Sequence, residues 1–128
     1  MTRILVVDDD HDLCDLLSDF LIEEGYEVTR AYTGQDAIDS ARNSAPDVLL
    51  LDLLLPDVSG IAVGRALRRS ADTRDVPIVI VSGDRAALAR SKLELSADSL
   101  LEKPFSFAAV QTAVRAALAR HDGAPGAA

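Results

Sequence analysis

Short runs of aliphatic residues alternate along the chain with stretches whose apolar residues recur every three or four positions. The strongest runs are Ile4–Val7, Val48–Leu51 and Ile78–Val81, and uninterrupted runs of this kind are typical of strands buried on both faces. Glu27–Ala31 and Ser99–Leu101 have weaker patterns and are predicted to be two further strands. The amphipathic stretches that follow the five runs are predicted to be helices.

Residues that start or stop helices lie at the boundaries of these stretches. Thr33, Ser59, Asp84 and Ser106 are each placed to accept hydrogen bonds from the free N–H groups of a first helical turn. Gly25 is placed to end the first helix in the left-handed conformation. The positions of these capping and helix-ending residues therefore agree with the helices that the apolar periodicity predicts.

Five strands, each followed by a helix, predict an α/β fold, a (βα)5 doubly wound parallel sheet with helices on both faces. The three aliphatic strands should be central, and the flavodoxin-like strand order 2-1-3-4-5 meets this condition. The chain of 128 residues fits one domain, which we expect to cover residues 1–120. Residues 121–128 are rich in Gly, Ala and Pro and are predicted to be a disordered tail or the start of a linker.

The composition limits the class of protein and its partners. Hydrophobic residues make up 48% and charged residues 27%, as in an ordinary globular domain. The net charge of −8 argues against direct binding of nucleic acid by this segment. The sequence has a single cysteine, Cys14, no recognisable signal peptide and no apolar run of membrane-spanning length, so we expect a cytoplasmic protein without membrane contact.

Polar residues follow four of the predicted strands at the point where the chain leaves the sheet. They are Asp8 and Asp9 after the first strand, Asp52 after the third, Ser82 after the fourth and Lys103 after the fifth. Because the carboxyl ends of parallel strands share one edge, we expect these side chains to converge. Carboxylate oxygens favour a hard divalent cation, and a lysine and a hydroxyl beside them suit a phosphoryl group. An aspartate in such a site can act as a nucleophile and form an acyl phosphate.

Taken alone, the run Asp8–Asp10 is equally typical of a loop that caps a helix. We interpret Asp57 as a helix-entry charge rather than a ligand. Other common sites are not supported by the sequence, which has no phosphate-binding glycine loop and no His/Cys zinc spacing. Neither His11 nor His121 falls at a strand end where it could act as a base.

Together these motifs resemble the receiver domain of bacterial two-component response regulators, from about residue 3 to about residue 119. The matching residues are Asp8-Asp9, Asp52 in the segment Asp52–Gly60, Ser82, and Lys103-Pro104-Phe105. The resemblance implies a phosphoacceptor signalling domain rather than a metabolic enzyme. Such a domain takes its phosphoryl group from a sensor histidine kinase, a phosphotransfer protein or a small donor, catalyses its own phosphorylation and dephosphorylation, and changes its partner surface.

By this resemblance, Asp52 is the phosphoacceptor and also a ligand of Mg²⁺, with Mn²⁺ as an alternative. Asp9 would bind the metal directly and Asp8 largely through water. The backbone carbonyl of Leu54 would supply a further ligand.

The resemblance also assigns a switch. Ser82 would hydrogen-bond the phosphoryl group, and Lys103 would pair with Asp52 before phosphorylation and with the phosphoryl group afterwards. The peptide bond between Lys103 and Pro104 is expected to be cis. Receivers usually carry Tyr or Phe three residues before this lysine, but here the position is Leu100. The usual aromatic switch therefore cannot operate as such, and output would rely on Ser82 and on shifts of the fourth helix.

Two rival interpretations stay open at this point. One is an interaction module of the same fold that works without phosphorylation. The other is an enzyme of a different class, either an aspartate-nucleophile phosphatase or a flavodoxin-like cofactor binder. Leu54 stands where such a phosphatase carries its second Asp, and the few aromatic residues disfavour a flavin site.

The expected partner surface is the face made by the fourth helix, the fifth strand and the fifth helix. It carries the basic residues Arg85, Arg90, Lys92 and Arg115. We expect this face to bind an output domain, a partly acidic partner or a second copy of the chain.

Overall fold

The structure is a computed structural model that describes residues 1–122. One sheet of five parallel strands forms its centre, in the order β2-β1-β3-β4-β5. The strands are β1 (Arg3–Val7), β2 (Glu27–Ala31), β3 (Val48–Asp52), β4 (Ile78–Ser82) and β5 (Ser99–Glu102). This confirms the predicted flavodoxin-like α/β fold and its strand order.

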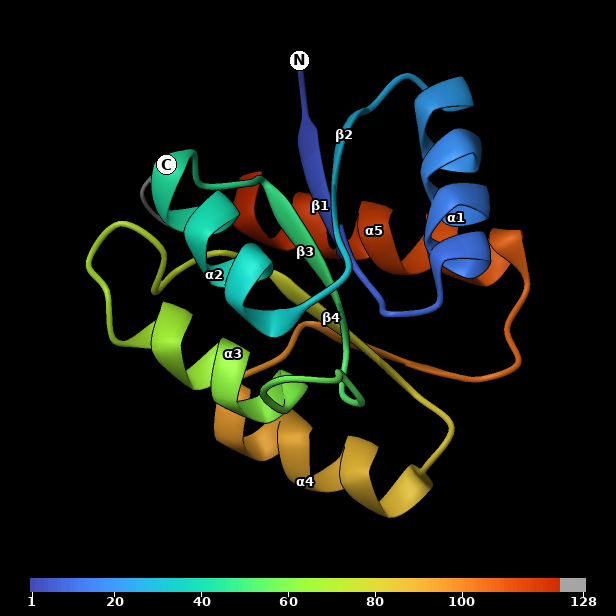
Figure 1. The fold of residues 1–128 in the computed structure, drawn as a ribbon. Helices are drawn as coiled ribbons and strands as arrows, with labels where there is room; N and C mark the ends of the chain where they lie inside the picture. Colours follow the sequence, from blue (N-terminus) through green and yellow to red (C-terminus); the bar gives the residue numbers. More distant parts are fainter. Residues whose placement is uncertain (123–128) are drawn as a thin grey trace.

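Five helices alternate with the strands and cover both faces of the sheet (Figure 1). They are α1 (His11–Glu23), α2 (Gly34–Asn43), α3 (Gly60–Arg68), α4 (Arg85–Leu95) and α5 (Phe107–Asp122). Helices α1 and α5 lie on one face, and α2, α3 and α4 lie on the other. The arrangement is a three-layer sandwich with a hydrophobic core on each side of the sheet.

Strand β1 shows how the aliphatic runs build both cores at once. Leu5 and Val7 pack into the core under α2, α3 and α4, while Ile4 and Val6 pack into the core under α1 and α5. All four side chains are at most 1% exposed. Since successive strand residues point to opposite faces, only an uninterrupted apolar run can serve both layers.

The predicted helix starts are confirmed by backbone hydrogen bonds. Each predicted capping side chain accepts a hydrogen bond from an N–H group two or three residues further on. These caps are Thr33, Ser59, Asp84 and Ser106. Gly25 has a φ of 97°, the left-handed conformation expected after the first helix. The caps fix where each loop at the carboxyl edge of the sheet becomes a helix.

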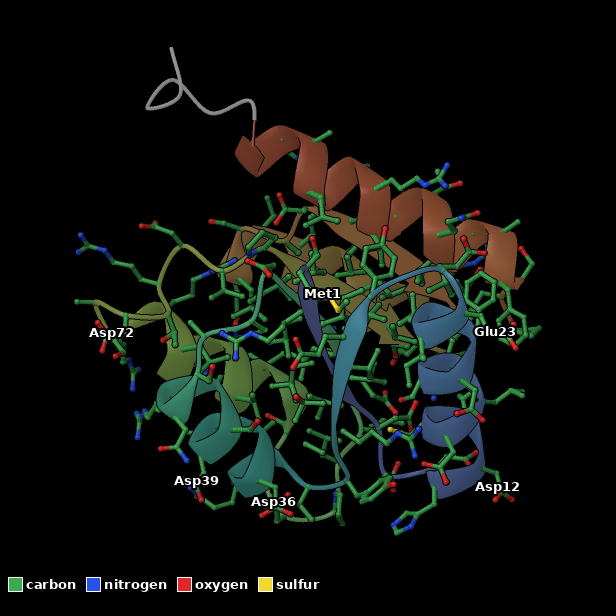
Figure 2. The ribbon with its side chains drawn as sticks, turned by 90° about the horizontal axis from the view of Figure 1, so that it is seen from above. Met1, Asp12, Glu23, Asp36, Asp39 and Asp72 are labelled. Carbon is green, nitrogen blue, oxygen red and sulfur yellow. The ribbon has the colours of Figure 1, made fainter. Side chains whose placement is uncertain are left out.

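The outer surface carries much of the negative charge. In Figure 2, Asp12, Asp36, Asp39 and Asp72 lie around the rim of the molecule, and all four are exposed. Helix α5 continues to Asp122, two residues past the boundary expected at residue 120, and residues 123–128 of the predicted tail lie outside the described residues. Within residues 1–122, every helix is too short or too polar to cross a bilayer.

Candidate functional site

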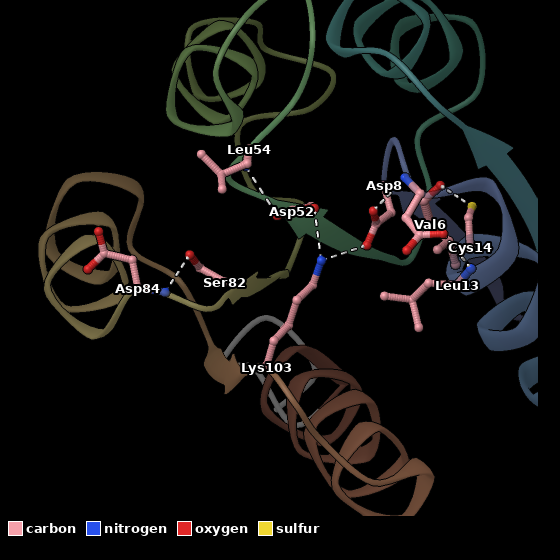
Figure 3. A network of polar contacts seen from close by, with 10 residues as sticks. Val6, Asp8, Leu13, Cys14, Asp52, Leu54, Ser82, Asp84 and Lys103 are labelled. Atoms are coloured by element: carbon pink, nitrogen blue, oxygen red, sulfur yellow. Dashed lines mark hydrogen bonds and ion pairs between the residues drawn. The ribbon is translucent and has the colours of Figure 1, made fainter.

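The predicted polar residues meet at the carboxyl edge of the sheet (Figure 3). Asp8 directly follows β1, Asp52 is the last residue of β3, and Ser82 is the last residue of β4. These three residues are almost completely buried, with exposed fractions of 2%, 3% and 2%. Lys103 follows β5 and enters the same pocket from its other side. The expected convergence of strand ends is therefore what the fold produces.

Three carboxylates in this pocket are close enough to share a cation. One oxygen from each of Asp8, Asp9 and Asp52 lies within 4.8 Å of the other two. Asp9 is exposed, so the cluster opens towards solvent. A set of carboxylate oxygens is the donor set that hard divalent cations prefer. The acidic triad fits a divalent metal.

Lys103 connects two of the acids. Its Nζ atom donates to Oδ2 of Asp52 at 3.1 Å and to Oδ2 of Asp8 at 3.3 Å. Burial acts to lower the pKa of Lys103, but the charges of Asp52 and Asp8 outweigh it and raise that pKa. The ammonium group therefore stays charged and offsets part of the negative charge in the pocket.

The backbone around Lys103 explains its position. The peptide bond to Pro104 is cis, as predicted, and the Lys103 N–H donates to the Ser82 carbonyl at 2.9 Å. This hydrogen bond extends the pairing of β4 and β5 by one residue beyond Ser82 and Glu102. The side chain is thereby directed across the edge of the sheet towards β3 and β1.

Asp8 carries an electrostatic cost in the absence of a cation. The pKa of its carboxyl group is raised to about 6: burial raises it most and the charge of Asp52 adds to this, while the Asp10 N–H and Lys103 lower it. The Asp10 N–H donates to Asp8 Oδ1 at 2.9 Å and so orients the group. A bound cation would relieve the repulsion between the carboxylates, which is a second reason why the site suits a metal.

The loop after β3 begins tightly against Asp52. The Leu54 N–H donates to Asp52 Oδ1 at 3.1 Å, and the Leu54 side chain is 74% exposed. A Cβ atom at Gly60 would lie only 2.3 Å from the Asp52 carbonyl oxygen, so a side chain there would displace the backbone. Glycine at the start of α3 lets the loop fold back onto the end of β3.

Ser82 lies at the same edge, next to the start of α4. Its Oγ atom accepts a hydrogen bond from the Asp84 N–H at 3.1 Å, and Asp84 in turn caps α4. Leu100 of β5 is half-buried and packs against the core under α2, α3 and α4. Ser82 is therefore hydrogen-bonded to the residue that caps α4, and Leu100 packs against the core on the same side of the sheet.

Asp57 does not act at the start of α3, the helix that follows it in the sequence. It precedes α3, yet its carboxylate accepts hydrogen bonds from Gly34 and Gln35, at the start of α2. Asp57 is therefore a charge at the start of a helix, and that helix is α2, which lies earlier in the sequence. No pattern within the loop itself could identify this partner, because the contact is made by tertiary packing.

The comparisons with known proteins decide the family. The response regulator receiver domain family matches residues 4–115 of the chain. The chain belongs to this family. This receiver domain is therefore a signalling domain with autophosphorylation chemistry.

Solved receiver structures agree closely with this one. A response regulator from Chloroflexus aurantiacus is 33% identical with a TM-score of 0.87, and the match covers 93% of this chain and 98% of that one. The chemotaxis response regulator CheY4 of Vibrio cholerae is 25% identical with a TM-score of 0.86, covering 92% and 99%. TrrA from Thermotoga maritima, solved in complex with Mg²⁺-BeF, is 31% identical with a TM-score of 0.82, covering 92% and 100%.

Membership in the family gives the pocket a function. Receiver domains interact with histidine kinases, and in this receiver domain Lys103 pairs with Asp8 and Asp52, two of the three clustered acids. The interpretations of the chain as a phosphatase or a flavin-binding protein are set aside by the family match.

Proposed function

We propose that Asp52 accepts a phosphoryl group from a sensor histidine kinase or a phosphotransfer protein in a Mg²⁺-dependent reaction. The observation that carries this proposal is the position of the Asp52 carboxylate, buried between the Lys103 ammonium group and the acids Asp8 and Asp9. In that position an oxygen of Asp52 attacks phosphorus, the bond from phosphorus to the donor breaks, and the bonding electrons leave with the donor.

We assign the metal to Asp8, Asp9, Asp52 and the backbone carbonyl of Leu54. Mg²⁺ is the cofactor we propose, with Mn²⁺ as a substitute, and the Mg²⁺-BeF complex of TrrA supports this choice. When bound, the metal supplies positive charge that offsets the phosphoryl oxygens and the three carboxylates. The raised pKa of Asp8 supports the same assignment, because it records how poorly the pocket tolerates its own charge.

Lys103 and Ser82 bind the oxygens of the phosphoryl group. Before the reaction, Lys103 holds Asp52 through its 3.1 Å contact, and afterwards the same ammonium group pairs with a phosphoryl oxygen. Ser82 donates a hydrogen bond to another phosphoryl oxygen. Its O–H group can donate in this way while Oγ still accepts from the Asp84 N–H, so a movement of Ser82 towards the phosphoryl group would be passed on to Asp84, the N-cap of α4.

The partner surface we propose is the face of α4, β5 and α5, where an output domain or a second copy of the chain would bind. Arg85 on this face already pairs with Glu102 at 2.6 Å, so its charge is partly compensated, whereas Arg90 and Lys92 are exposed. In this proposal, Ser82 and Leu100 transmit the state of the pocket to this face. We propose a cytoplasmic site of action, with no membrane or nucleic acid as a direct partner of this segment.

Intact-mass spectrometry tests the proposal. The protein is incubated with acetyl phosphate and Mg²⁺, and we expect a mass gain of one phosphoryl group that does not occur when excess chelator is present from the start. Asp52→Asn should abolish the gain, whereas Asp39→Asn on the exposed side of α2 should leave it unchanged. A wild-type protein that gains no mass would instead support a phosphorylation-independent interaction module.

A further inference from the structure

The loop between β3 and α3 carries one of the proposed metal ligands. Its first residues are held close to the sheet, because the Leu53 N–H donates to the Val81 carbonyl at 3.1 Å and the Gly60 N–H donates to the Leu53 carbonyl at 2.9 Å. Leu54, whose carbonyl is the proposed ligand, follows directly and has an exposed side chain. A carbonyl in such a loop can bind a metal only if the whole loop holds its shape.

Asp57 anchors the middle of this loop to α2. Its Oδ1 atom accepts from the Gly34 N–H at 2.8 Å, and its Oδ2 atom accepts from the Gln35 N–H at 2.9 Å. These N–H groups belong to the first turn of a helix, where no intrahelical acceptor exists for them. The two hydrogen bonds lower the pKa of Asp57 to about 2, with the bond from Gln35 contributing most. The carboxylate therefore stays ionised at neutral pH and keeps both hydrogen bonds.

Close packing fixes the distance between the loop and the helix. A Cβ atom at Gly34 would lie 2.2 Å from Val58 Cγ2 and 2.9 Å from Val63 Cγ2. The loop therefore approaches the start of α2 as closely as the backbone of a glycine allows. Val58 and Leu55 also pack against the core on this side of the sheet.

We propose that Asp57 is a positioning residue for metal binding, which holds the β3–α3 loop on α2 and thereby keeps the Leu54 carbonyl aimed at the cation. The proposal rests on the proposed function, since it concerns the same metal site. Asp57 does not touch the pocket; it acts through the loop. Partners that orient a ligand from outside its first coordination sphere typically change metal affinity by 10–100-fold when they are lost.

The test measures Mg²⁺ binding to the metal-free protein by isothermal titration calorimetry. Asp57→Asn retains the volume of the side chain, but its amide group can accept only one of the two hydrogen bonds and turns an N–H group towards the other donor. We expect the Mg²⁺ dissociation constant to rise about tenfold. The rate of phosphorylation by acetyl phosphate should fall at low Mg²⁺ and recover to within about twofold of wild type at saturating Mg²⁺, because only metal occupancy is impaired.

Two further variants and one measurement keep the result interpretable. Asp36→Asn removes the same charge from the first turn of α2 without breaking a contact to the loop, so its Mg²⁺ dissociation constant should stay within about twofold of wild type. Asp57→Ala should weaken Mg²⁺ binding at least as much as Asp57→Asn. Amide hydrogen exchange should become faster at Leu54 and Gly34 in both Asp57 variants but not in Asp36→Asn.

A different outcome would overturn the inference. If both Asp57 variants bind Mg²⁺ as wild type does, or if Asp36→Asn weakens binding equally, Asp57 is a helix cap or a general charge and not a positioning residue. If the wild-type protein itself neither binds Mg²⁺ nor takes up a phosphoryl group, the proposed function fails and takes the inference with it. The wild-type titration distinguishes these two failures.

Discussion

Asp8 shows how a single residue reports the state of the pocket. Burial and the charge of Asp52 hold its pKa at about 6 in the folded, metal-free protein, against an ordinary value of 3.8. A raised carboxyl pKa means that the folded state tolerates the ionised form less well than the unfolded state does. The cost is fully present above about pH 6, shrinks as the pH falls, and is absent below about pH 4, where both states are protonated.

Asp8→Asn should therefore stabilise the metal-free protein at about pH 7.5, by roughly 1–3 kcal/mol. The gain should shrink steadily towards about pH 4, because wild-type Asp8 takes up a proton over that range. Thermal unfolding followed by circular dichroism in the presence of chelator, at several pH values, measures this difference. A variant that is less stable than wild type at neutral pH, or a gain that grows on acidification, would contradict the electrostatic account of the pocket.

The residues of the site differ in how far the sequence alone could predict them. Asp8, Asp52 and Lys103 were predictable because each one ends or directly follows a strand, and the alternation of strands and helices brings those strand ends together. The two hydrogen bonds of Lys103 depend on the path of the β5–α5 turn, which a residue pattern does not define. The partners of Asp57 lie more than twenty residues earlier in the chain, so local sequence rules could predict a helix-entry charge but could not identify the helix.

Secondary-structure elements were predicted well where local chemistry determines them. The capping side chains and Gly25 lie where the backbone needs them, and the aliphatic runs correspond to the central strands. The end of α5 at Asp122 could not be read from the sequence, because the Gly/Ala/Pro composition changes gradually and gives no sharp stop. How the helices pack against each other had to come from the structure.

Helices α3 and α4 meet at a point where only a glycine fits. A Cβ atom at Gly64 would lie 2.5 Å from Leu95 Cδ1, and Arg65 pairs with Glu94 at 2.7 Å beside this contact. Leu95 is 1% exposed and has little room to move aside. The carboxyl end of α4 therefore packs closely against α3. The amino end of α4 is linked to Ser82 through its N-cap, Asp84.

Gly64→Ala should destabilise the domain by about 1–3 kcal/mol through overpacking against Leu95. The sign is informative, since the same change at an unhindered helical position stabilises a helix by up to ~1 kcal/mol. Urea denaturation followed by circular dichroism gives the free energy of unfolding. A stability equal to or above that of wild type would show that α4 moves away from α3 at no cost and is not seated as described.

On the scale of the whole molecule, the fold brings three carboxylates together at one edge of the sheet, where a bound cation would offset their charge. Anything that binds only the folded state stabilises it by mass action, by about 2.7 kcal/mol at a ligand concentration one hundred times its dissociation constant. Mg²⁺ should therefore raise the melting temperature in a concentration-dependent way, and Asp9→Asn should abolish most of the increase. An equal increase in Asp9→Asn would show that Mg²⁺ acts through general screening of the charge of −8 and not at the triad.

The central claim is that Asp52 becomes phosphorylated to an acyl phosphate, and chemical trapping measures this directly. The protein is treated with acetyl phosphate and Mg²⁺, reduced with borohydride, which converts an aspartyl phosphate to homoserine, and mapped by peptide mass spectrometry. The account predicts homoserine at position 52 and nowhere else, with no conversion when Mg²⁺ is chelated. Homoserine at Asp8, Asp9 or Asp57, or an unmodified Asp52 under these conditions, would contradict it.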